Sequence, residues 1–353
     1  MTTEILPFLK KMISVPGLSG FETPIRSLIQ EAWAPLTDDL QISRLGSLHA
    51  LRRGTAPEPR PSLLLSAHMD AIGLMVTGIS AGFLRVTKVG GLDPRVLPGQ
   101  LVTVHGREDL PGMIVQPPER LLPSSEQKRT VPMEHLFIDT GLLPGEVERK
   151  VRVGDLVSFA QEPLETAGDT LVGLSLDNRA SVAVLTSFLQ ALQNRPHAWD
   201  VWAIASSQEE ETLGGAITSA YELQPAFSIV VDVTFASSPG SPSHKTYPLG
   251  KGPTIGWGPN VHPYLFDTMK ELADRLEIPY KIEVMAHHSG TDAFGIQIVA
   301  EGIPGIVIGI PLRYMHTPVE MVMLKDISRA GRLLAEFVLA LPVDFMDKMV
   351  WKD

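Results

Sequence analysis

The sequence predicts an α/β protein into which a smaller β-rich domain is inserted, and two observations carry this prediction. In residues 1–71 and again in residues 173–353, short apolar runs typical of buried strands alternate with segments of helical periodicity. From Ile72 to about Val172 the helical periodicity disappears, and short strand-like runs alternate with glycine and proline. We therefore expect one discontinuous α/β domain, formed by residues 1–71 and 173–353, with an insertion at 72–172.

The first part of the chain contains two expected helices and one strand. Apolar residues keep helical spacing in 5–12 and again in 25–33, on either side of a turn at 16–20. The apolar run 63–65 reads as a buried strand and leads directly into residues 66–70, Ser-Ala-His-Met-Asp.

A histidine and a carboxylate therefore follow the first expected strand of the core. His68 and Asp70 are two residues apart, so in an extended segment both side chains point to the same side. A carboxylate behind an imidazole is common in metal sites, but an ordinary structural hydrogen bond explains the pair equally well. The pair alone leaves both interpretations open.

The insertion reads as a small barrel or sandwich that does not extend the main sheet, because its strands are short and interrupted by turn residues. Residues 78–82 match the G-x-S-x-G pattern of serine hydrolases, which needs a helix after it. Strand-like runs flank the pattern on both sides, so we expect Ser80 to lie at a hairpin turn. The expected strands are 83–86, 101–104, 112–115, 136–138 and 155–159.

The α/β pattern resumes with a helix after Asp177, whose apolar residues recur at helical spacing as far as Leu192. Aspartate is a good helix N-cap, so Asp177 alone has a purely structural explanation. The other expected elements of this part are the strands 201–205, 228–231 and 306–310 and the helices 265–276 and 327–338.

Acidic residues gather at the end of the expected strand 201–205. Residues 207–211 read Ser-Gln-Glu-Glu-Glu, and adjacent carboxylates repel one another unless positive charge lies near them. Ligands and catalytic groups in open α/β sheets collect at the carboxyl ends of strands. A solvated acidic loop is the alternative explanation. It is weakened here because other strand ends carry similar side chains.

Two imidazoles and three carboxylates stand at expected strand or helix ends: His68, Asp177, Glu210, Asp232 and His316. Nitrogen and oxygen ligands without sulfur suit zinc, cobalt or manganese. Five ligands exceed what one tetrahedral ion accepts, but they fit two ions that share a bridging carboxylate. Paired ions of this kind generate hydroxide and stabilise developing charge in hydrolases. A two-carboxylate glycosidase would leave both histidines unexplained.

The composition limits the partners and the compartment. The net charge is −10 and no basic run is present, so we expect neither nucleic acid nor a membrane as partner. The chain has no cysteine, so any metal must be held by His, Asp and Glu. The N-terminus lacks a signal pattern and no apolar run approaches the length of a membrane span, so we expect a cytoplasmic protein.

In the segments that contain the five candidate ligands, the chain resembles the di-metal tetrahedral aminopeptidases of metallopeptidase family 42. That family includes glutamyl and deblocking aminopeptidases, and some members have been labelled endoglucanases. The resemblance covers nearly the whole chain and is carried by residues 66–70, 176–179, 208–210, 232–234 and 314–321, together with 16–20, 90–94 and 289–293.

The resemblance implies a role for each site residue. Glu209 would be the general base, and Asp70 would orient His68. The cofactors would be two divalent metal ions per subunit, zinc or alternatively cobalt or manganese. The implied ligands are His68 and Asp232 for one ion, Glu210 and His316 for the other, and Asp177 as the bridge between them.

The resemblance also implies the fold and the assembly. The fold would be an α/β/α phosphorylase/hydrolase-like catalytic domain with an inserted β-barrel-like domain that makes subunit contacts. Twelve subunits, built from dimers, would form a hollow homo-oligomer, a dodecamer that admits only peptides as substrates.

The chain departs from the family pattern at two positions. Asn178 stands where a second aspartate is common, and Glu211 with Thr212 stands where Val-Gly is usual. Neither departure removes an implied ligand, although the Glu211 carboxylate could alter substrate preference or metal affinity, and it could anchor a peptide amine. We therefore expect a metallo-aminopeptidase that trims short peptides. A metal-dependent deacylase or amidohydrolase is the nearest alternative, and a non-catalytic binding protein is the distant one.

Overall fold

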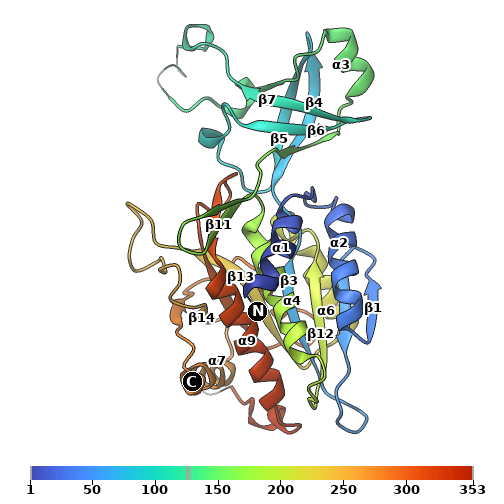
Figure 1. Cartoon of the computed structure of the whole chain (residues 1–353), viewed down its shortest axis with the longest axis vertical. Coiled ribbons are helices and arrows are strands. Elements are labelled where there is room, and N and C mark those ends of the chain that lie inside the picture. Colours follow the sequence, from blue (N-terminus) through green and yellow to red (C-terminus); the bar gives the residue numbers. More distant parts are fainter. Residues whose placement is uncertain (1, 125–126, 128, 352–353) are drawn as a thin grey trace.

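The computed structural model describes residues 2–124, 127 and 129–351 of the chain. The fold has two parts, a large sheet with helices on both faces and a small barrel that stands beyond one end of that sheet (Figure 1). The α/β class and the β-barrel-like insertion predicted from the sequence are both confirmed.

The large sheet has 11 strands, and four parallel strands form its centre. These central strands are β12 (Asp200–Ser206), β3 (Ser62–His68), β13 (Phe227–Phe235) and β16 (Gly305–Arg313), in that order. Their carboxyl ends meet at one edge, because Ser206 pairs with His68 and Asp232 pairs with Gly309. The outer strands are β1 (Asp39–Ile42), β2 (Leu48–Arg52), β10 (Leu164–Thr166), β11 (Thr170–Gly173), β14 (Thr254–Trp257), β15 (Lys281–Val284) and β17 (Glu320–Met323).

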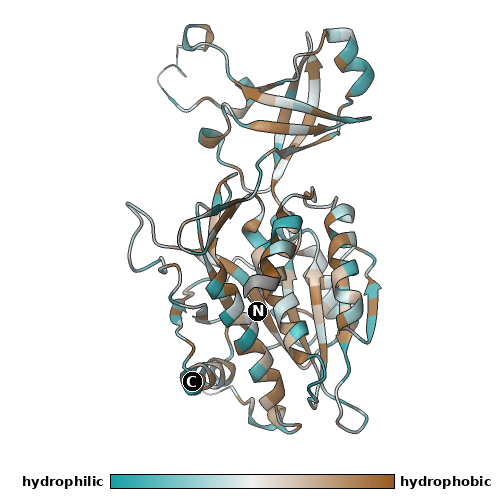
Figure 2. Cartoon of the chain, in the orientation of Figure 1, coloured by the Kyte–Doolittle hydropathy of each residue, from teal (hydrophilic) through white to brown (hydrophobic). Residues whose placement is uncertain are grey.

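Helices cover both faces of the sheet, and the alternation of side chains along β3 explains why. Leu63 and Leu65 pack into the larger core, whereas Leu64 packs into the core on the opposite face. A strand that is buried on both faces is mostly apolar, and Figure 2 shows the central strands as predominantly hydrophobic. The larger core lies under α1 (Thr2–Ile13), α2 (Thr23–Trp33), α4 (Leu176–Leu192), α7 (Pro263–Arg275) and α9 (Leu324–Ala340), and the smaller under α6 (Gly214–Leu223) and α8 (Asp292–Gln297).

The barrel is closed by six antiparallel strands and has a core of its own. Alternate residues point inward, as at Leu74 and Val76 or at Val102 and Val104, so each short strand contributes one apolar face. The expected hairpin at Ser80 is present, since Ser80 pairs with Phe83 across the turn. The strands are β4 (Gly73–Ser80), β5 (Phe83–Val89), β8 (Phe137–Asp139), β7 (Asp109–Val115), β6 (Leu101–His105) and β9 (Leu156–Phe159), and α3 (Pro144–Lys150) precedes the last of them.

One sequence-based expectation about the insertion is wrong. The segment 72–172 was expected not to extend the main sheet, yet β10 and β11 belong to it, and β11 pairs with β17. The physical reason is that Leu171 is fully buried in the larger core of the sheet, a contact that the barrel cannot offer. The division of the chain into domains at 72 and 172 stays a prediction.

In the part of the chain that the structure describes, no helix is long and apolar enough to cross a membrane.

The aromatic cluster around Phe227 in the larger core gives a stability prediction. Phe227 is fully buried, and its ring centroid lies 5.5 Å from that of Trp199 and 5.6 Å from that of Phe345. Phe227→Ala should lower the free energy of unfolding by about 3–5 kcal/mol, because it removes these contacts and leaves a cavity. Denaturant unfolding measures the loss. Tyr221→Ala, at a side chain that is 65% exposed, is the control and should change stability little; equal effects of the two substitutions would contradict the prediction.

Candidate metal centre

The carboxyl edge of the parallel strands brings the predicted site residues together. His68 is the last residue of β3, and Asp232 lies beside it on β13. After β12 the chain turns at Gln208, whose φ is +58°, and enters the one-turn helix α5 (Glu209–Thr212). Adjacent residues of a strand point to opposite sides of the sheet. Because the chain turns before Glu209 and Glu210, both of these neighbours line the same cavity. A single cavity of about 580 Å³ is lined by His68, Asp177, Glu209, Glu210, Asp232 and His316 among others.

The Asp177 carboxylate lies between the two imidazoles. Its Oδ1 is 3.3 Å from Nε2 of His68, and its Oδ2 is 3.3 Å from Nε2 of His316. Each oxygen therefore faces a different histidine, as a bridging carboxylate must. Asp177 is the second residue of α4, where the backbone is not yet helical, and its side chain lines the cavity.

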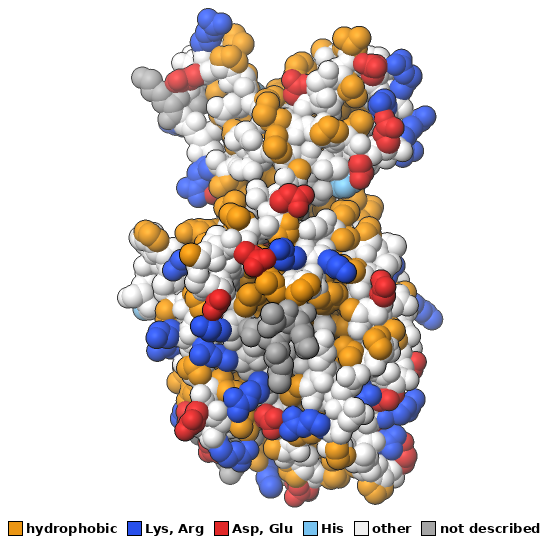
Figure 3. Space-filling model, viewed as in Figure 1, with side chains coloured by type: hydrophobic (Ala, Val, Ile, Leu, Met, Phe, Trp, Pro, Cys, Tyr) orange, Lys and Arg blue, Asp and Glu red, His pale blue; other side chains and the backbone are white. Residues whose placement is uncertain are grey.

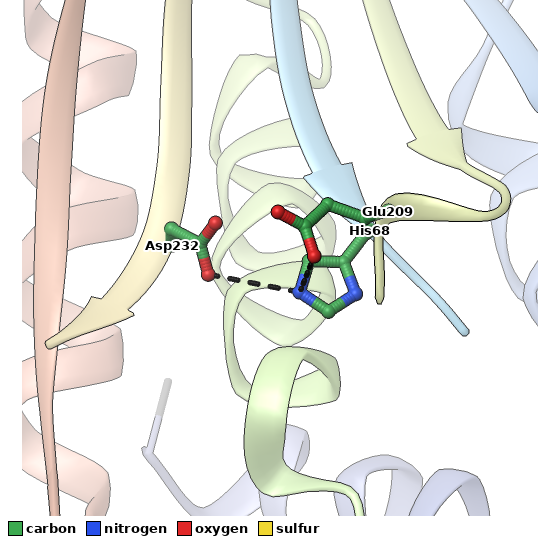
Figure 4. A group of neighbouring side chains, drawn as sticks. All are labelled: His68, Glu209 and Asp232. Carbon is green, nitrogen blue, oxygen red and sulfur yellow. Dashed lines mark ion pairs between the residues drawn. The ribbon is translucent and has the colours of Figure 1, made fainter. Parts of the chain in front are cut away.

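The remaining carboxylates are divided between the two histidines. Glu210 Oε2 lies 3.5 Å from Nε2 of His316. On the other side, Nε2 of His68 lies 3.8 Å from Asp232 Oδ1 and 3.7 Å from Glu209 Oε2, and Figure 4 shows both carboxylates directed at this one nitrogen. Two overlapping groups could hold a metal: His68, Glu209 and Asp232, and His68, Asp177 and Glu210.

The acids of the cavity repel one another. Burial, reinforced by Asp177, raises the pKa of Glu210 to about 10, and burial likewise raises the pKa of Glu209 to about 8. Burial alone would lower the pKa of His68, but the surrounding carboxylates raise it well above its ordinary value. The raised pKa values of the two glutamates mean that a further cation is needed if all the carboxylates of this donor set are to be ionised together. Its nitrogen and oxygen atoms, without sulfur, fit divalent cations.

Asp70 lies behind His68 and has two sets of contacts. Its Oδ1 is 3.4 Å from Nδ1 of His68, which is the contact that the sequence suggested. Its two oxygens also accept the backbone N–H groups of Glu209, at 3.0 Å, and Glu210, at 3.2 Å. One fully buried carboxylate therefore holds the start of the acidic turn by two hydrogen bonds and lies next to the imidazole.

Glu320 is a site residue whose role sequence reasoning missed, although it stands within the quoted segment 314–321. It is almost fully buried, and its two oxygens accept the backbone N–H groups of Asp177, at 3.0 Å, and His316, at 2.9 Å. His316 has φ +61°, so its backbone needs such support. The only sequence signal was an acid four residues after a candidate ligand.

Arg179 is a buried cation close to the two carboxylates that position the centre. Its guanidinium donates to the carbonyls of Met12 and Val15, at the end of α1, and is attracted by Asp70 and Glu320. Burial lowers its pKa to about 10, a value at which it keeps its charge in neutral solution. Arg179 therefore offsets the two carboxylates that position the centre without entering the cavity.

The barrel reaches this centre through one loop. The N–H of Gly90 donates to Oε1 of Glu211 at 2.6 Å. A Cβ on Gly91 would lie 2.7 Å from Nδ1 of His316, so a larger residue there would displace the imidazole. Glu211, considered above as an anchor for a peptide amine, is engaged by this loop.

An open α/β sheet with a His-and-carboxylate centre at its carboxyl edge, and a barrel beside it, defines a metallohydrolase type of architecture. The model of the M42 glutamyl aminopeptidase family matches residues 46–333, and the chain belongs to this family. It is thus a hydrolase that acts on peptide bonds, of a family that uses divalent metals.

Relatives and solved structures agree with this membership. The lysyl aminopeptidase of Pyrococcus furiosus is 33% identical over 96% of this chain and 98% of its own length. The glutamyl aminopeptidase of Lactococcus lactis is 26% identical over 96% of this chain and 97% of its own length. The TET aminopeptidase of the Thaumarchaeota archaeon SCGC AB-539-E09 superposes with a TM-score of 0.92, at 29% identity, over 98% of this chain and 100% of that one.

Glu320 provides a prediction for the centre. Each backbone N–H is bonded to a different oxygen of Glu320, so in Glu320→Gln the amide NH2 group faces the N–H of Asp177 or of His316, which then loses its acceptor. Affinity for divalent metal should fall about 10- to 100-fold, as expected when a group that orients ligands is removed. Chelator competition measures it. The control is Glu301→Gln on the exposed surface, and unchanged affinity in Glu320→Gln would refute the positioning role.

Proposed function

We propose that the chain is an aminopeptidase that binds two divalent ions per subunit and removes N-terminal residues from short peptides. The observation that carries this proposal is the Asp177 carboxylate, with one oxygen 3.3 Å from each of two imidazoles. The assigned ligands are His68 and Asp232 for one ion, Glu210 and His316 for the other, and Asp177 as the bridge. Zinc suits these donors best, and cobalt or manganese would also suit them.

When bound, the ions would polarise the scissile carbonyl and lower the pKa of the attacking water. Glu209 is assigned as the general base that takes the proton of this water and delivers it to the departing amine. Its Oε2 is 3.7 Å from Nε2 of His68, close to the reacting region. The hydrogen bond from its backbone N–H to Asp70 holds the backbone of Glu209 in place at the start of the acidic turn.

Glu209 could alternatively bind metal itself, because it forms a possible ligand group with His68 and Asp232. The assignment as base rests on the family resemblance and on the presence of enough other ligands. The acidic wall of the cavity also suits a substrate with a free ammonium group, which favours an aminopeptidase over a deacylase.

The two neighbouring glutamates separate these roles. Glu209→Gln keeps the shape of the side chain but cannot accept a proton, so it should retain both metals and lose about 10²–10⁴-fold in turnover. Glu210→Gln should instead weaken metal binding. Metal analysis and the rate on a leucyl anilide measure both variants. Loss of metal in Glu209→Gln would make Glu209 a ligand, and full activity with metal bound would remove it from the mechanism.

We further propose that the protein is a cytoplasmic homo-oligomer, a dodecamer built from dimers. A solved relative, 27% identical with a TM-score of 0.82, is described as a dodecamer, and the TET1 peptidase of Pyrococcus horikoshii as a tetrahedron or an octahedral shell. The barrel supports association because it exposes large apolar side chains (Figure 3). They include Phe83, Leu101, Met113, Leu121, Leu143 and Val153.

Light scattering tests the assembly. The native chain should have several times the mass of one 38.4 kDa subunit. Leu143→Asp, at a barrel side chain that is 71% exposed, should reduce the mass, because a charge is costly to bury in a contact. Val343→Asp, 54% exposed and outside the barrel, is the matched control. An active native monomer would overturn the proposal.

A further inference from the structure

The turn at residues 16–20 is part of the family resemblance, but the proposed mechanism gives it no role. Two backbone hydrogen bonds attach this turn to Ala71, which follows Asp70. The N–H of Ser19 donates to the carbonyl of Ala71 at 3.1 Å, and the N–H of Ala71 donates to the carbonyl of Gly17 at 3.0 Å. The turn therefore lies beside the end of β3, at the edge of the sheet where the metal centre lies.

Glu22 follows this turn and stands immediately before α2, where an acid would ordinarily interact with the start of the helix. Its side chain makes no capping hydrogen bond to the first turn of α2, which the structure describes in full. The residue is only 3% exposed. Glu22 is therefore a buried acid whose carboxylate is directed at other partners.

One oxygen of Glu22 joins two distant segments of the backbone. Its Oε1 accepts the N–H of Gly20, at 2.6 Å, and the N–H of Gln208, at 3.0 Å. Gln208 has φ +58° and stands immediately before Glu209. The Glu22 side chain thus attaches the turn at 16–20 to the residue at which the chain changes direction after β12.

Three successive N–H groups at the start of the acidic turn are accepted by two buried carboxylates. The N–H of Gln208 donates to Glu22, and those of Glu209 and Glu210 donate to Asp70. The first N–H groups of a helix have no acceptor within the helix, so partners from other segments determine where this turn lies. Glu209 is held by Asp70 through its own N–H and by Glu22 through the residue before it.

We propose that Glu22 is a positioning residue for the general base Glu209, which it holds through the N–H of Gln208. The inference rests on the proposed function, because it takes Glu209 as the base. Without Glu22, Asp70 would still bind the N–H of Glu210, so this assigned ligand would keep its place. A base is more sensitive, since a displacement of about 1 Å can lower the rate about 100-fold. Loss of Glu22 should therefore lower turnover more than it lowers metal affinity.

The use of a single oxygen by both N–H groups provides the test. In Glu22→Gln the amide oxygen can take the position of Oε1 and accept both of them. Burial raises the pKa of Glu22 and so already disfavours a charge there. Glu22→Gln should therefore keep the native kcat. Glu22→Met fills a similar space without an acceptor, so it should lower kcat about 10- to 100-fold while KM and the amount of bound metal change little.

The rate on a leucyl anilide and metal analysis of the purified protein measure these variants. Glu31→Met is the matched control, because Glu31 is an exposed acid on the same helix α2, and it should behave as the native enzyme. A native kcat in folded Glu22→Met overturns the inference. An equal loss in Glu22→Gln also overturns it, because the charge and not the acceptor would then matter.

Two further outcomes count against the positioning role. Glu22→Met overturns the inference if it loses metal as strongly as turnover, or if it does not fold, because Glu22 would then support the whole centre or the whole fold. In all these cases the native enzyme is active, so the proposed function stands. A metal-loaded native enzyme that does not cleave the anilide overturns the proposed function itself, and the inference with it.

Discussion

The position of one carboxylate, that of Asp177 between two imidazoles, is the constraint on which the rest of the site depends. Each of its oxygens faces a different histidine at 3.3 Å. The histidines come from distant parts of the chain, one at the end of β3 and the other after β16. The sheet brings these residues to one place because it aligns the carboxyl ends of several parallel strands.

Holding this arrangement requires buried groups that face away from the cavity. Asp70 accepts the backbone N–H groups of the acidic turn, and Glu320 accepts those of Asp177 and His316. Both carboxylates are buried, and Arg179 supplies the nearby positive charge. A buried charge without a partner is costly, so the support of the centre and the stability of the surrounding core cannot be separated.

Most residues of the candidate site could be predicted from the sequence, because each follows a local pattern along the chain. Apolar runs followed by His68, Glu209 or Asp232 can be recognised without knowing which strands are neighbours, and the structure brings these residues to one cavity. The roles of Glu320 and Glu22 depend on contacts between distant segments of the chain, which no local pattern encodes. The same limit applies to β10 and β11, whose place in the main sheet depends on β17. Barrel closure, likewise, follows from pairings across the whole insertion.

The loop at Gly90 and Gly91 connects the barrel to the metal centre through direct contacts with Glu211 and His316. Its N–H is bonded to Glu211 at 2.6 Å, and its backbone lies so close to His316 that a side chain at Gly91 would displace the imidazole. A rigid rotation of the barrel would therefore press on this histidine or withdraw from it. The free energies of barrel orientation and of histidine placement are thermodynamically linked, and such linkage is reciprocal. A contact that fixes the orientation of the barrel would therefore also restrict the imidazole of His316 to its position in the centre. Conversely, a ligand that fixes this imidazole would restrict the orientation of the barrel.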